Sequence, residues 1–448
     1  MADVASTTKK LTYGTWKYQR TWSPKEIVDA EGCYFTDASG KRYLDFSSQL
    51  MCSNLGHKNK AVIEAICEQA KRLPYIYPGF ACGPRSQLST ELTKVLPHGL
   101  EKFFYATSGT EANEAAIKIA RLFTGKYKVI SRYQSYHGST TGSISVSGDP
   151  RRIPIEPAGT MHGAIFGPDA YCYRCPFGLE YPNCDIACAD YVEYMIKHEG
   201  NVAAVMVEPI VGTNGVLVPP DEYLPRIREI TSKYGVLLIC DEVMTAWGRT
   251  GKWFAVDHWN VKPDILTTAK GITGAYIPLS VTATTQEIAD YFEDNYFAHG
   301  HTYEAHPLTL AAGVAAIAEY KRLNLIERAE RVGKILGSKL KPLLERHPSV
   351  GDVRGIGMFW AIELVRDKKS KLPTNTIEEK LAGKPLVIDK VASACMENGV
   401  FIMTGFTNYL IVAPPLIAEE TDLDRGVTTL DKSLNIADAM IASGTEFR

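Results

Sequence analysis

The sequence predicts an α/β protein, with a large domain built on a mostly parallel central sheet flanked by helices and a smaller α+β domain formed by both ends of the chain. Three observations predict this fold. The chain has 448 residues, which is enough for a large core and two domains. Between residues 87 and 268, short apolar runs alternate with helical patterns, as in a parallel sheet covered on both faces. A long helical tract then leads into a shorter mixed region.

These patterns also predict where the domains begin and end. We expect residues 1–60 to form an N-terminal arm and part of the smaller domain. Residues 61–330 are predicted to form the large domain, and residues 331–448 the C-terminal part of the smaller one. Within the first segment, aromatic and polar residues alternate over residues 32–46, which predicts a β-hairpin. Apolar residues at helical spacing predict a helix over Lys60–Leu73.

The large domain is predicted to contain strands and helices in turn. Its expected elements are helix Gln87–Leu96, strand Lys102–Ala106, helix Glu111–Phe123, strand Lys128–Ser131, a helix near Ala189–His198, strand Val202–Val207, helix Tyr223–Tyr234, strand Val236–Ile239 and strand Ile265–Thr268. Parallel strands need crossover helices, so this order favours one sheet with helices on both faces.

The remaining chain is predicted to leave this sheet and build the smaller domain. A helical tract runs from about Pro307 to Arg346, and residues 366–385 are Lys-rich and expected to form a surface loop. The other expected elements are strand Phe359–Val365, helix Val387–Asn398, strand Val400–Met403, strand Tyr409–Val412 and helix Asp422–Asn435.

Composition narrows the kind of partner. Lys and Arg total 49 against 51 acidic residues, so we expect no nucleic-acid or membrane-surface partner, which would require a basic face. No apolar run approaches the ~20 residues of a membrane span. The N-terminal residues lack a hydrophobic signal core, so a cytoplasmic location is predicted. No GxGxxG motif follows an early strand, which argues against a dinucleotide-dependent dehydrogenase.

Four cysteines lie close together in the sequence and allow two interpretations. Cys172, Cys175, Cys184 and Cys188 have a spacing near that of a zinc site. Only eight residues separate the two pairs, which is short for a zinc ribbon. The alternative is a set of reduced thiols in an irregular loop, and that is the interpretation we favour, with no metal predicted. A disulfide is not expected in a reducing compartment.

The residues that carry chemistry lie at the ends of two predicted neighbouring strands. Asp241 follows the strand Val236–Ile239, and Lys270 follows the strand Ile265–Thr268 among small residues. A lysine can hold an aldehyde cofactor as a Schiff base, and an acid can keep a pyridine nitrogen protonated. This pair therefore indicates catalysis with a pyridine aldehyde, whereas either residue alone would indicate an ordinary surface lysine or a capping acid.

A third motif suits a phosphate group. Strand residues Phe103–Tyr105 lead into Ser108-Gly109-Thr110 and then into a helix. The N–H groups at a helix start bind phosphate, and a glycine permits close approach. Ser108 is predicted to cap this helix, with Glu111 in its first turn.

Taken together, these motifs resemble the class III aminotransferases, which are fold-type I pyridoxal 5′-phosphate (PLP) enzymes. The resemblance covers roughly Trp22 to Leu434 and includes the segments SGTEANE, YHG, VEP, DEV and HTYEAHP. It implies that residues 61–330 bind PLP, that Lys270 forms the Schiff base and moves the proton, and that Asp241 faces the pyridine nitrogen. It further implies that Tyr136 and Val243 pack on the two faces of the ring, that Glu208 lies beside it, and that Ser108, Gly109 and Thr110 hold the phosphate.

The resemblance also predicts an assembly. Thr302, in HTYEAHP, corresponds to a residue that reaches the phosphate in the neighbouring subunit. This implies a homodimer with shared active sites, and a tetramer remains an alternative. The N-terminal arm, with Trp16 and Trp22, is expected to help roof an active site, often that of the partner. The histidines His299, His301 and His306 could suggest a metal, but the motif explains this segment without one.

Departures from the family pattern bear on the substrate. Met244 replaces the glutamine of the branches that act on 4-aminobutyrate and ornithine, and Ser139 replaces an arginine that follows YHG in the 4-aminobutyrate enzymes. Many ω-transaminases place a mobile arginine before an APPL motif, yet no arginine lies between Phe401 and Val412 here. Met51 stands where many amine transaminases have a tryptophan. The possible replacements for the missing cation are Arg85, Arg132 and Arg174.

The resemblance therefore predicts a transaminase whose donor is an ω-amino acid, taurine or a primary amine and whose acceptor is a keto acid, with pyruvate favoured. An aminomutase, racemase or decarboxylase of the same fold is an alternative outcome for the same cofactor. A non-catalytic, zinc-bearing binding protein on this fold is a third, against which the intact Asp241 and Lys270 argue.

Overall fold

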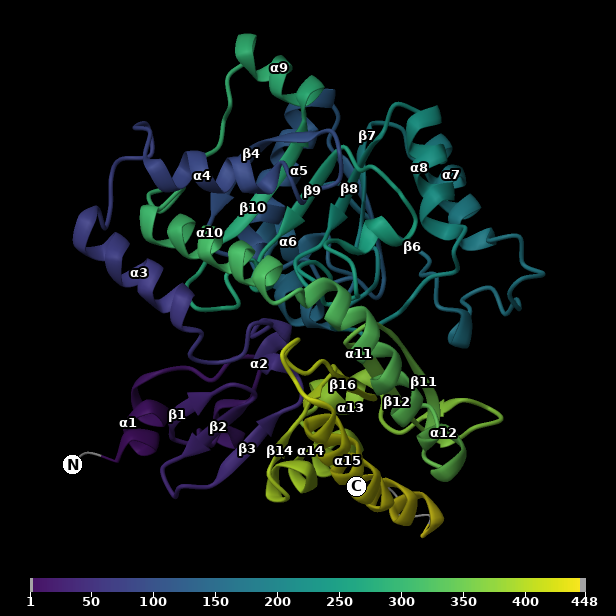
Figure 1. The fold of residues 1–448 in the computed structure, drawn as a ribbon. Helices are drawn as coiled ribbons and strands as arrows, with labels where there is room; N and C mark the ends of the chain where they lie inside the picture. Colours follow the sequence, from purple (N-terminus) through teal and green to yellow (C-terminus); the bar gives the residue numbers. More distant parts are fainter. Residues whose placement is uncertain (1–2, 444–448) are drawn as a thin grey trace.

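The computed structural model describes residues 3–443 and shows two lobes, with a large sheet in the upper lobe and two smaller sheets in the lower one (Figure 1). The first and last described helices, α1 (Val4–Leu11) and α15 (Glu420–Ala442), both lie in the lower lobe. No helix among residues 3–443 is long and apolar enough to cross a membrane. The predicted cytoplasmic location stays a prediction.

The upper lobe is built on a seven-stranded sheet in the order β4-β10-β9-β8-β7-β5-β6. The strands are β4 (Leu100–Ala106), β5 (Lys128–Arg132), β6 (Ala164–Gly167), β7 (Val202–Val207), β8 (Leu237–Asp241), β9 (Ile265–Thr268) and β10 (Ser280–Thr285). All neighbouring pairs are parallel except those that β10 makes with β4 and β9. The predicted mostly parallel sheet is confirmed.

The central strands of this sheet, such as β7, are buried along their whole length because helices cover both faces of the sheet. The helices of this lobe are α3 (Lys60–Arg72), α4 (Gly83–Leu92), α5 (Gly109–Thr124), α6 (Thr141–Ser145), α7 (Ala187–Glu199), α8 (Tyr223–Lys233), α9 (Gln286–Asp294) and α10 (Pro307–Arg322). The predicted helix Gln87–Leu96 is shifted, because Pro84 sits at the first turn and starts α4 at Gly83.

Several elements of this lobe were missed in the sequence. Strand β6 has only four residues, three of them half-buried, and β10 is rich in Thr and Ser and so has no apolar run. The position of β10 is determined by its pairing with neighbouring strands and not by its own residue pattern. β10 is held between β4 and β9 by hydrogen bonds on both edges, and all but its last residue are buried.

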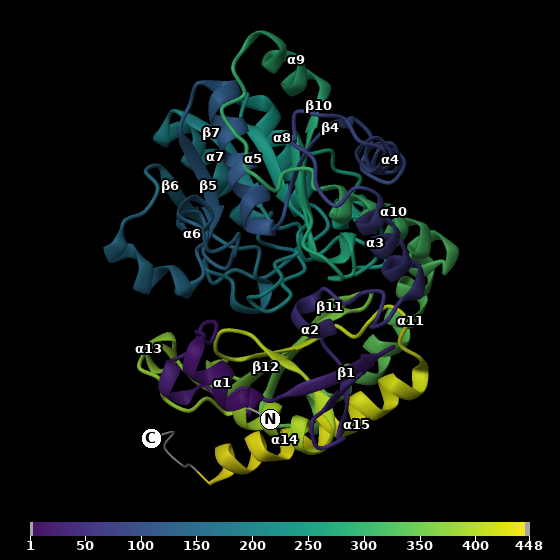
Figure 2. The ribbon, with the colours of Figure 1, turned by 90° about the vertical axis from the view of Figure 1, so that its left-hand side faces the viewer.

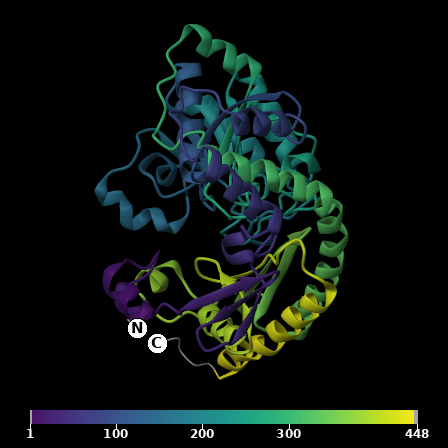
Figure 3. The same ribbon diagram turned by 60° about the vertical axis from the view of Figure 1, so that its left-hand side comes forward.

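A helical path joins the two lobes along one side of the molecule (Figure 3). The predicted tract from Pro307 to Arg346 is three helices, namely α10, α11 (Leu325–Leu340) and α12 (Leu343–Arg346). The first break falls at Asn324, which adopts φ +47°, a left-handed conformation that asparagine tolerates. The second break falls at Pro342, which caps α12 and lacks the N–H that a continuous helix would use.

The lower lobe combines both ends of the chain. Strands β1 (Ile27–Glu31), β2 (Tyr34–Asp37) and β3 (Arg42–Asp45) form a sheet, and β14 (Val400–Phe401) pairs with β3 in parallel. A second sheet contains β11 (Val350–Ile356), β12 (Phe359–Asp367), β16 (Tyr409–Val412) and β15 (Met403–Thr404). Figure 2 shows helices α14 (Val387–Glu397) and α15 lying along this lobe. The predicted α+β domain made from both ends is confirmed, whereas the boundaries at 61 and 331 stay predictions.

Two expectations for this lobe were wrong. The segment Val400–Met403 is not one strand, because β14 pairs with the N-terminal hairpin while β15 pairs with β16 in the other sheet. Residues 366–385 are not simply a loop. They contain β13 (Leu372–Pro373), paired with β12, and α13 (Ile377–Leu381), capped by Thr376. Of these pairings, only that of β14 with β3 joins segments that are distant in sequence.

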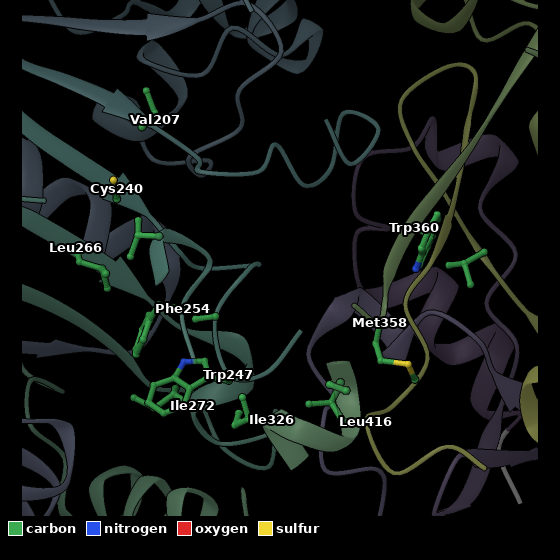
Figure 4. Close-up of a cluster of buried hydrophobic side chains, with 14 of the residues drawn as sticks. Val207, Cys240, Trp247, Phe254, Leu266, Ile272, Ile326, Met358, Trp360 and Leu416 are labelled. Carbon is green, nitrogen blue, oxygen red and sulfur yellow. The ribbon is translucent and has the colours of Figure 1, made fainter. Parts of the chain in front are cut away.

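One apolar core continues between the lobes. Figure 4 shows Ile326 and Leu416 lying between Trp247 of the upper lobe and Met358 of the lower one, and all four belong to the same buried cluster. Beside this core lies the fully buried Arg249, which donates to the carbonyl groups of Met358 (3.0 Å) and Pro414 (2.7 Å). The lobes are therefore joined by packing and by polar contacts around one guanidinium group.

Candidate active site

A cavity of about 470 Å³ opens where the parallel strands of the large sheet end. Ligands of open α/β sheets bind at this carboxyl edge, because loops there diverge and leave a crevice. The cavity brings together nearly all of the predicted site residues, together with Asn113, His137 and Met244. The predicted residues in its wall are Ser108, Gly109, Thr110, Tyr136, Glu208, Asp241, Val243 and Lys270.

Asp241 is the last residue of β8 and is buried. Its Oδ2 accepts hydrogen bonds from Nδ2 of Asn113 (2.8 Å) and lies 2.7 Å from Nδ1 of His137. Its Oδ1 accepts the N–H of Val243 at 2.9 Å. These contacts fix the plane of the carboxylate and hold it at the floor of the cavity.

Asn113 and His137 were not predicted as site residues, although both lie inside quoted motifs. Asn113 also accepts a hydrogen bond from the Thr267 hydroxyl (2.7 Å), which connects α5 to β9 beneath Asp241. Because an ionised carboxylate can only accept, Nδ1 of His137 carries the hydrogen in this contact. Asn113 is one of several polar residues in SGTEANE, and His137 is the central residue of YHG. Nothing in the sequence showed that both side chains would contact the carboxylate of Asp241.

Lys270 follows β9 and lies in the wall of the same cavity. Its backbone has φ +48°, a left-handed conformation that a lysine seldom adopts and that is often found at functional sites. Burial lowers the pKa of its amine, while the negative charge of Asp241 acts in the opposite direction. A lowered pKa increases the fraction of neutral amine, the form that can act as a nucleophile or accept a proton.

The N-terminus of α5 points its free amides at the cavity. Ser108 caps the helix by accepting the Glu111 N–H, and Glu111 accepts the N–H groups of Thr107 and Ser108, so the predicted cap is confirmed. The N–H groups of Gly109 and Thr110 find no acceptor within residues 3–443. With the positive end of the helix dipole, they form a site for an anion such as a phosphate.

Two glycines leave the space that a flat, phosphorylated cofactor requires. A Cβ atom on Gly109 would lie 2.8 Å from Cγ1 of Val243, and one on Gly138 would lie 2.2 Å from Oγ1 of Thr110. Gly138 also has φ +136°. Side chains at these positions would close the gap between the anion site and the cavity. The Lys270 amine, the Asp241 carboxylate, the free amides at the start of α5 and the space beside the two glycines together fit PLP.

Tyr136 and Val243 both line the cavity, and Glu208 holds the loop that carries Tyr136. Oε1 of Glu208 accepts the Tyr136 N–H (3.0 Å), and Oε2 accepts the Gly212 N–H (2.8 Å). Burial raises the pKa of the Glu208 carboxyl. The structure thus shows Glu208 positioning backbone at the rim of the cavity.

Thr302 is the predicted site residue that the cavity of this chain does not include. It is exposed, and its carbonyl accepts a hydrogen bond from the Tyr75 hydroxyl (3.0 Å). Its hydroxyl makes no hydrogen bond to another group within residues 3–443.

None of the three arginines considered as carboxylate ligands lines the cavity. Arg132 is buried and donates to the carbonyl of Glu208. Arg174 pairs with Glu363 at 2.6 Å, and Arg85 donates to the carbonyl of Pro78 at 2.8 Å. The three other positions at which the sequence departs from the family pattern differ in where they lie. Met244 and Ser139 line the cavity, whereas the buried Met51 packs in an apolar cluster that includes Met244.

The cysteine cluster shows no disulfide, and its four thiols are free. Among residues 3–443 there is no group of three or more His, Cys, Asp or Glu side chains arranged to hold a metal ion. The structure therefore supplies no ligand set for zinc at Cys172, Cys175, Cys184 and Cys188.

The fold and this site define a PLP-dependent enzyme of fold-type I. A family model described as aminotransferase class-III matches residues 18–434, so the chain belongs to the class III aminotransferases, which use PLP. A taurine–pyruvate aminotransferase from Bilophila wadsworthia is 35% identical over 449 residues, covering 96% of this chain and 97% of that protein. A leucine/methionine racemase from Thermococcus litoralis is 34% identical and covers 92% and 91%.

A solved structure agrees with this assignment. The taurine:2-oxoglutarate aminotransferase from Bifidobacterium kashiwanohense, in complex with PLP and glutamate, superposes with a TM-score of 0.92. It is 36% identical, and the match covers 97% of this chain and 98% of that one.

Proposed function

We propose that this class III aminotransferase moves an amino group from an ω-amino acid, taurine or a simple primary amine to a keto acid, with pyruvate as the preferred acceptor. The observation that carries the proposal is the convergence of Lys270, Asp241 and the free amides of α5 on one cavity. Similarity to a taurine–pyruvate aminotransferase supports the donor class.

Each residue of the cavity has a distinct role in this proposal. Lys270 is the amine that would hold the cofactor's aldehyde, and it would carry the proton removed from the substrate Cα. Asp241 would keep the pyridine nitrogen protonated through its fixed carboxylate. When bound, PLP supplies an electron sink for the negative charge that develops at that carbon. The amides of Gly109 and Thr110, with Ser108, would hold its phosphate.

The ring would lie between Tyr136 and Val243, with Glu208 beside it. The aromatic face of Tyr136 suits stacking on a flat heterocycle, and the branched side chain of Val243 suits the opposite face. Glu208 would act indirectly, because its two oxygens fix the N–H groups of Tyr136 and Gly212.

We further propose that the enzyme is a homodimer whose subunits share their active sites. Thr302 supports this because it is exposed and outside the cavity of its own chain. Its hydroxyl would complete the phosphate site of the partner. A tetramer made of two such dimers is the alternative assembly.

A second outcome of the same chemistry is favoured by the similarity to a leucine/methionine racemase. A racemase returns the amino group to the substrate, whereas a transaminase keeps it on the cofactor until a keto acid arrives. An aminomutase or decarboxylase would likewise leave the cofactor unchanged. Donor alone should therefore convert the cofactor stoichiometrically to its amine form in a transaminase and not in the others.

The experiment that tests the proposal is a panel of amine donors with pyruvate and 2-oxoglutarate as acceptors. We expect turnover with the parent enzyme, and neither turnover nor a bound-cofactor absorbance at about 410–420 nm in Lys270→Ala. Lys262→Ala, at an exposed lysine near β9, is the control and should keep both. Transamination by Lys270→Ala at the parent's rate would refute the mechanism.

A further inference from the structure

Arg151 is a cation beside the active site that the sequence did not single out. It follows Asp149, a fully buried carboxylate, and lies in the 3₁₀ segment Pro150–Ala158. Nε donates to Oδ1 of Asp149 and Nη2 to Oδ2, both at 2.8 Å. This two-point contact fixes the plane of the guanidinium group. The side-chain hydrogen bonds of Arg151 within residues 3–443 use Nε and Nη2, so the edge that carries Nη1 remains available.

The guanidinium group lies against two aromatic rings. Its central carbon is 3.8 Å from the ring centre of Tyr136, which lines the cavity, and 5.3 Å from that of Trp16 in the N-terminal arm. Trp16 meets Tyr136 edge-on, with ring centres 6.4 Å apart. Arg151 is therefore held against Tyr136, a residue of the cavity wall, by stacking and by the buried carboxylate of Asp149.

Arg151 is also electrostatically close to the reacting amine. After burial, its positive charge is among the influences that lower the pKa of Lys270. The nearby alternatives are occupied, because Arg132 is bound to a backbone carbonyl and Arg174 to Glu363. The segment between Phe401 and Val412 contains no arginine at all.

We infer that Arg151 binds the anionic end of the substrate, the carboxylate of the keto acid and the carboxylate or sulfonate of the donor. A guanidinium whose plane is already fixed loses little freedom on binding, and its remaining N–H groups match the geometry of such oxygens. Trp16 and Tyr136 would then form apolar walls for the short carbon chain between the amine and the anion. This inference rests on the proposed function and names its specificity residue.

A matched pair of donors tests this role. Taurine carries a sulfonate, and 2-aminoethyl methyl sulfone has nearly the same shape without the negative charge. The rate at which each donor alone bleaches the cofactor isolates the first half-reaction from the keto acid. In Arg151→Gln we expect the ratio of the two second-order rate constants, taurine over sulfone, to fall about 10- to 100-fold, the range of a charge-assisted hydrogen bond.

Two further variants separate charge from position. Arg151→Lys keeps a cation without the fork and should recover part of the ratio. Arg152→Gln removes the neighbouring arginine, which stacks on Phe166 and pairs with Glu156 away from the cavity, and should leave the ratio within about twofold of the parent. If Arg151→Gln slows both donors equally, Arg151 only positions Tyr136 and the inference is wrong.

A binding measurement distinguishes this failure from failure of the proposed function. Isethionate, a sulfonate without an amine, cannot react and can be titrated into the holoenzyme by calorimetry. It should bind the parent and Arg152→Gln and bind Arg151→Gln at least about tenfold more weakly. Equal binding by the parent and Arg151→Gln, or no binding by the parent, would overturn the role of Arg151. A parent that binds isethionate but converts no donor would overturn the proposed function alone.

Discussion

Nδ1 of His137 lies 2.7 Å from Oδ2 of Asp241, and both side chains are almost completely buried. The contact connects the loop after β5 to the end of β8, so the loop that carries Tyr136 and the acid at the cavity floor are positioned together. An isolated buried carboxylate would be costly, and this contact, with Asn113 and the Val243 N–H, compensates for that cost.

The first prediction concerns this hydrogen bond. His137→Phe keeps a ring but removes the donor, so Asp241 should be held less firmly against the pyridine nitrogen. We expect the affinity for PLP to fall roughly tenfold, because a hydrogen bond to a charged group contributes about 1.5 kcal/mol or more. Absorbance titration of the cofactor-free protein measures it. Ser131→Ala, which leaves the Asp241 contact intact and removes a hydroxyl that lies 3.3 Å from Nε2 of His137 and 2.9 Å from Oγ of Ser135, is the control. Equal affinities for both variants would contradict the prediction.

The second prediction is a pH dependence of stability. Burial lowers the pKa of Lys270 in the folded protein below its ordinary value. Between the two pKa values the unfolded chain binds more protons, so the free energy of unfolding should rise with pH in that range. Urea unfolding of the cofactor-free protein from about pH 7 to about pH 10 should show this rise relative to Lys270→Met. A constant difference between the two proteins over this range would show that burial does not shift this amine.

The third prediction uses two glycines with positive φ. Gly138→Ala places a Cβ 2.2 Å from Oγ1 of Thr110, whereas Gly99→Ala, at φ +101°, meets nothing within 4 Å. Both should lose about 1 kcal/mol from backbone strain, and Gly138→Ala should lose about 1–2 kcal/mol more and bind PLP more weakly. Urea denaturation and cofactor titration compare them. If the two substitutions lowered the free energy of unfolding equally, the predicted clash at Gly138 would be wrong.

The fourth prediction concerns Arg249, whose guanidinium group is buried between the lobes. Beyond two carbonyl groups, it donates to Oγ of Ser48 (3.0 Å) and Oδ1 of Asn54 (2.6 Å). Arg249→Met would leave these acceptors unpaired and should reduce the free energy of unfolding by about 3 kcal/mol. Arg331→Met, at an exposed position of α11, should change it by less than about 0.5 kcal/mol. Similar denaturation midpoints for both variants would argue against this role.

The fifth prediction tests the shared active site. Lys270→Ala removes the reacting amine, and Thr302→Ala removes the hydroxyl proposed to serve the partner. In a mixed dimer, one site would combine Lys270 from one chain with Thr302 from the other and should work at low PLP concentration. Co-refolded or co-expressed variants should therefore exceed the activity of either alone. No gain on mixing, with dimers demonstrated by light scattering, would place Thr302 outside the site.

The sequence by itself determined five of the seven strands of the upper sheet and identified eight residues that line the cavity. Asp241 and Lys270 each follow an apolar strand, and the ends of neighbouring parallel strands must meet at one edge of the sheet. Ser108, Gly109 and Thr110 were predictable because a cap, a glycine and a helix start are local in sequence.

Only the tertiary structure decided which polar groups complete the site. Asn113, His137 and Arg151 reach Asp241 or Tyr136 across distances in the chain that no local pattern encodes. The same holds for β10 and for the split of Val400–Met403, since a strand's place depends on the partners that accept its hydrogen bonds. Local propensity therefore specified the elements, while long-range packing specified which side chains meet.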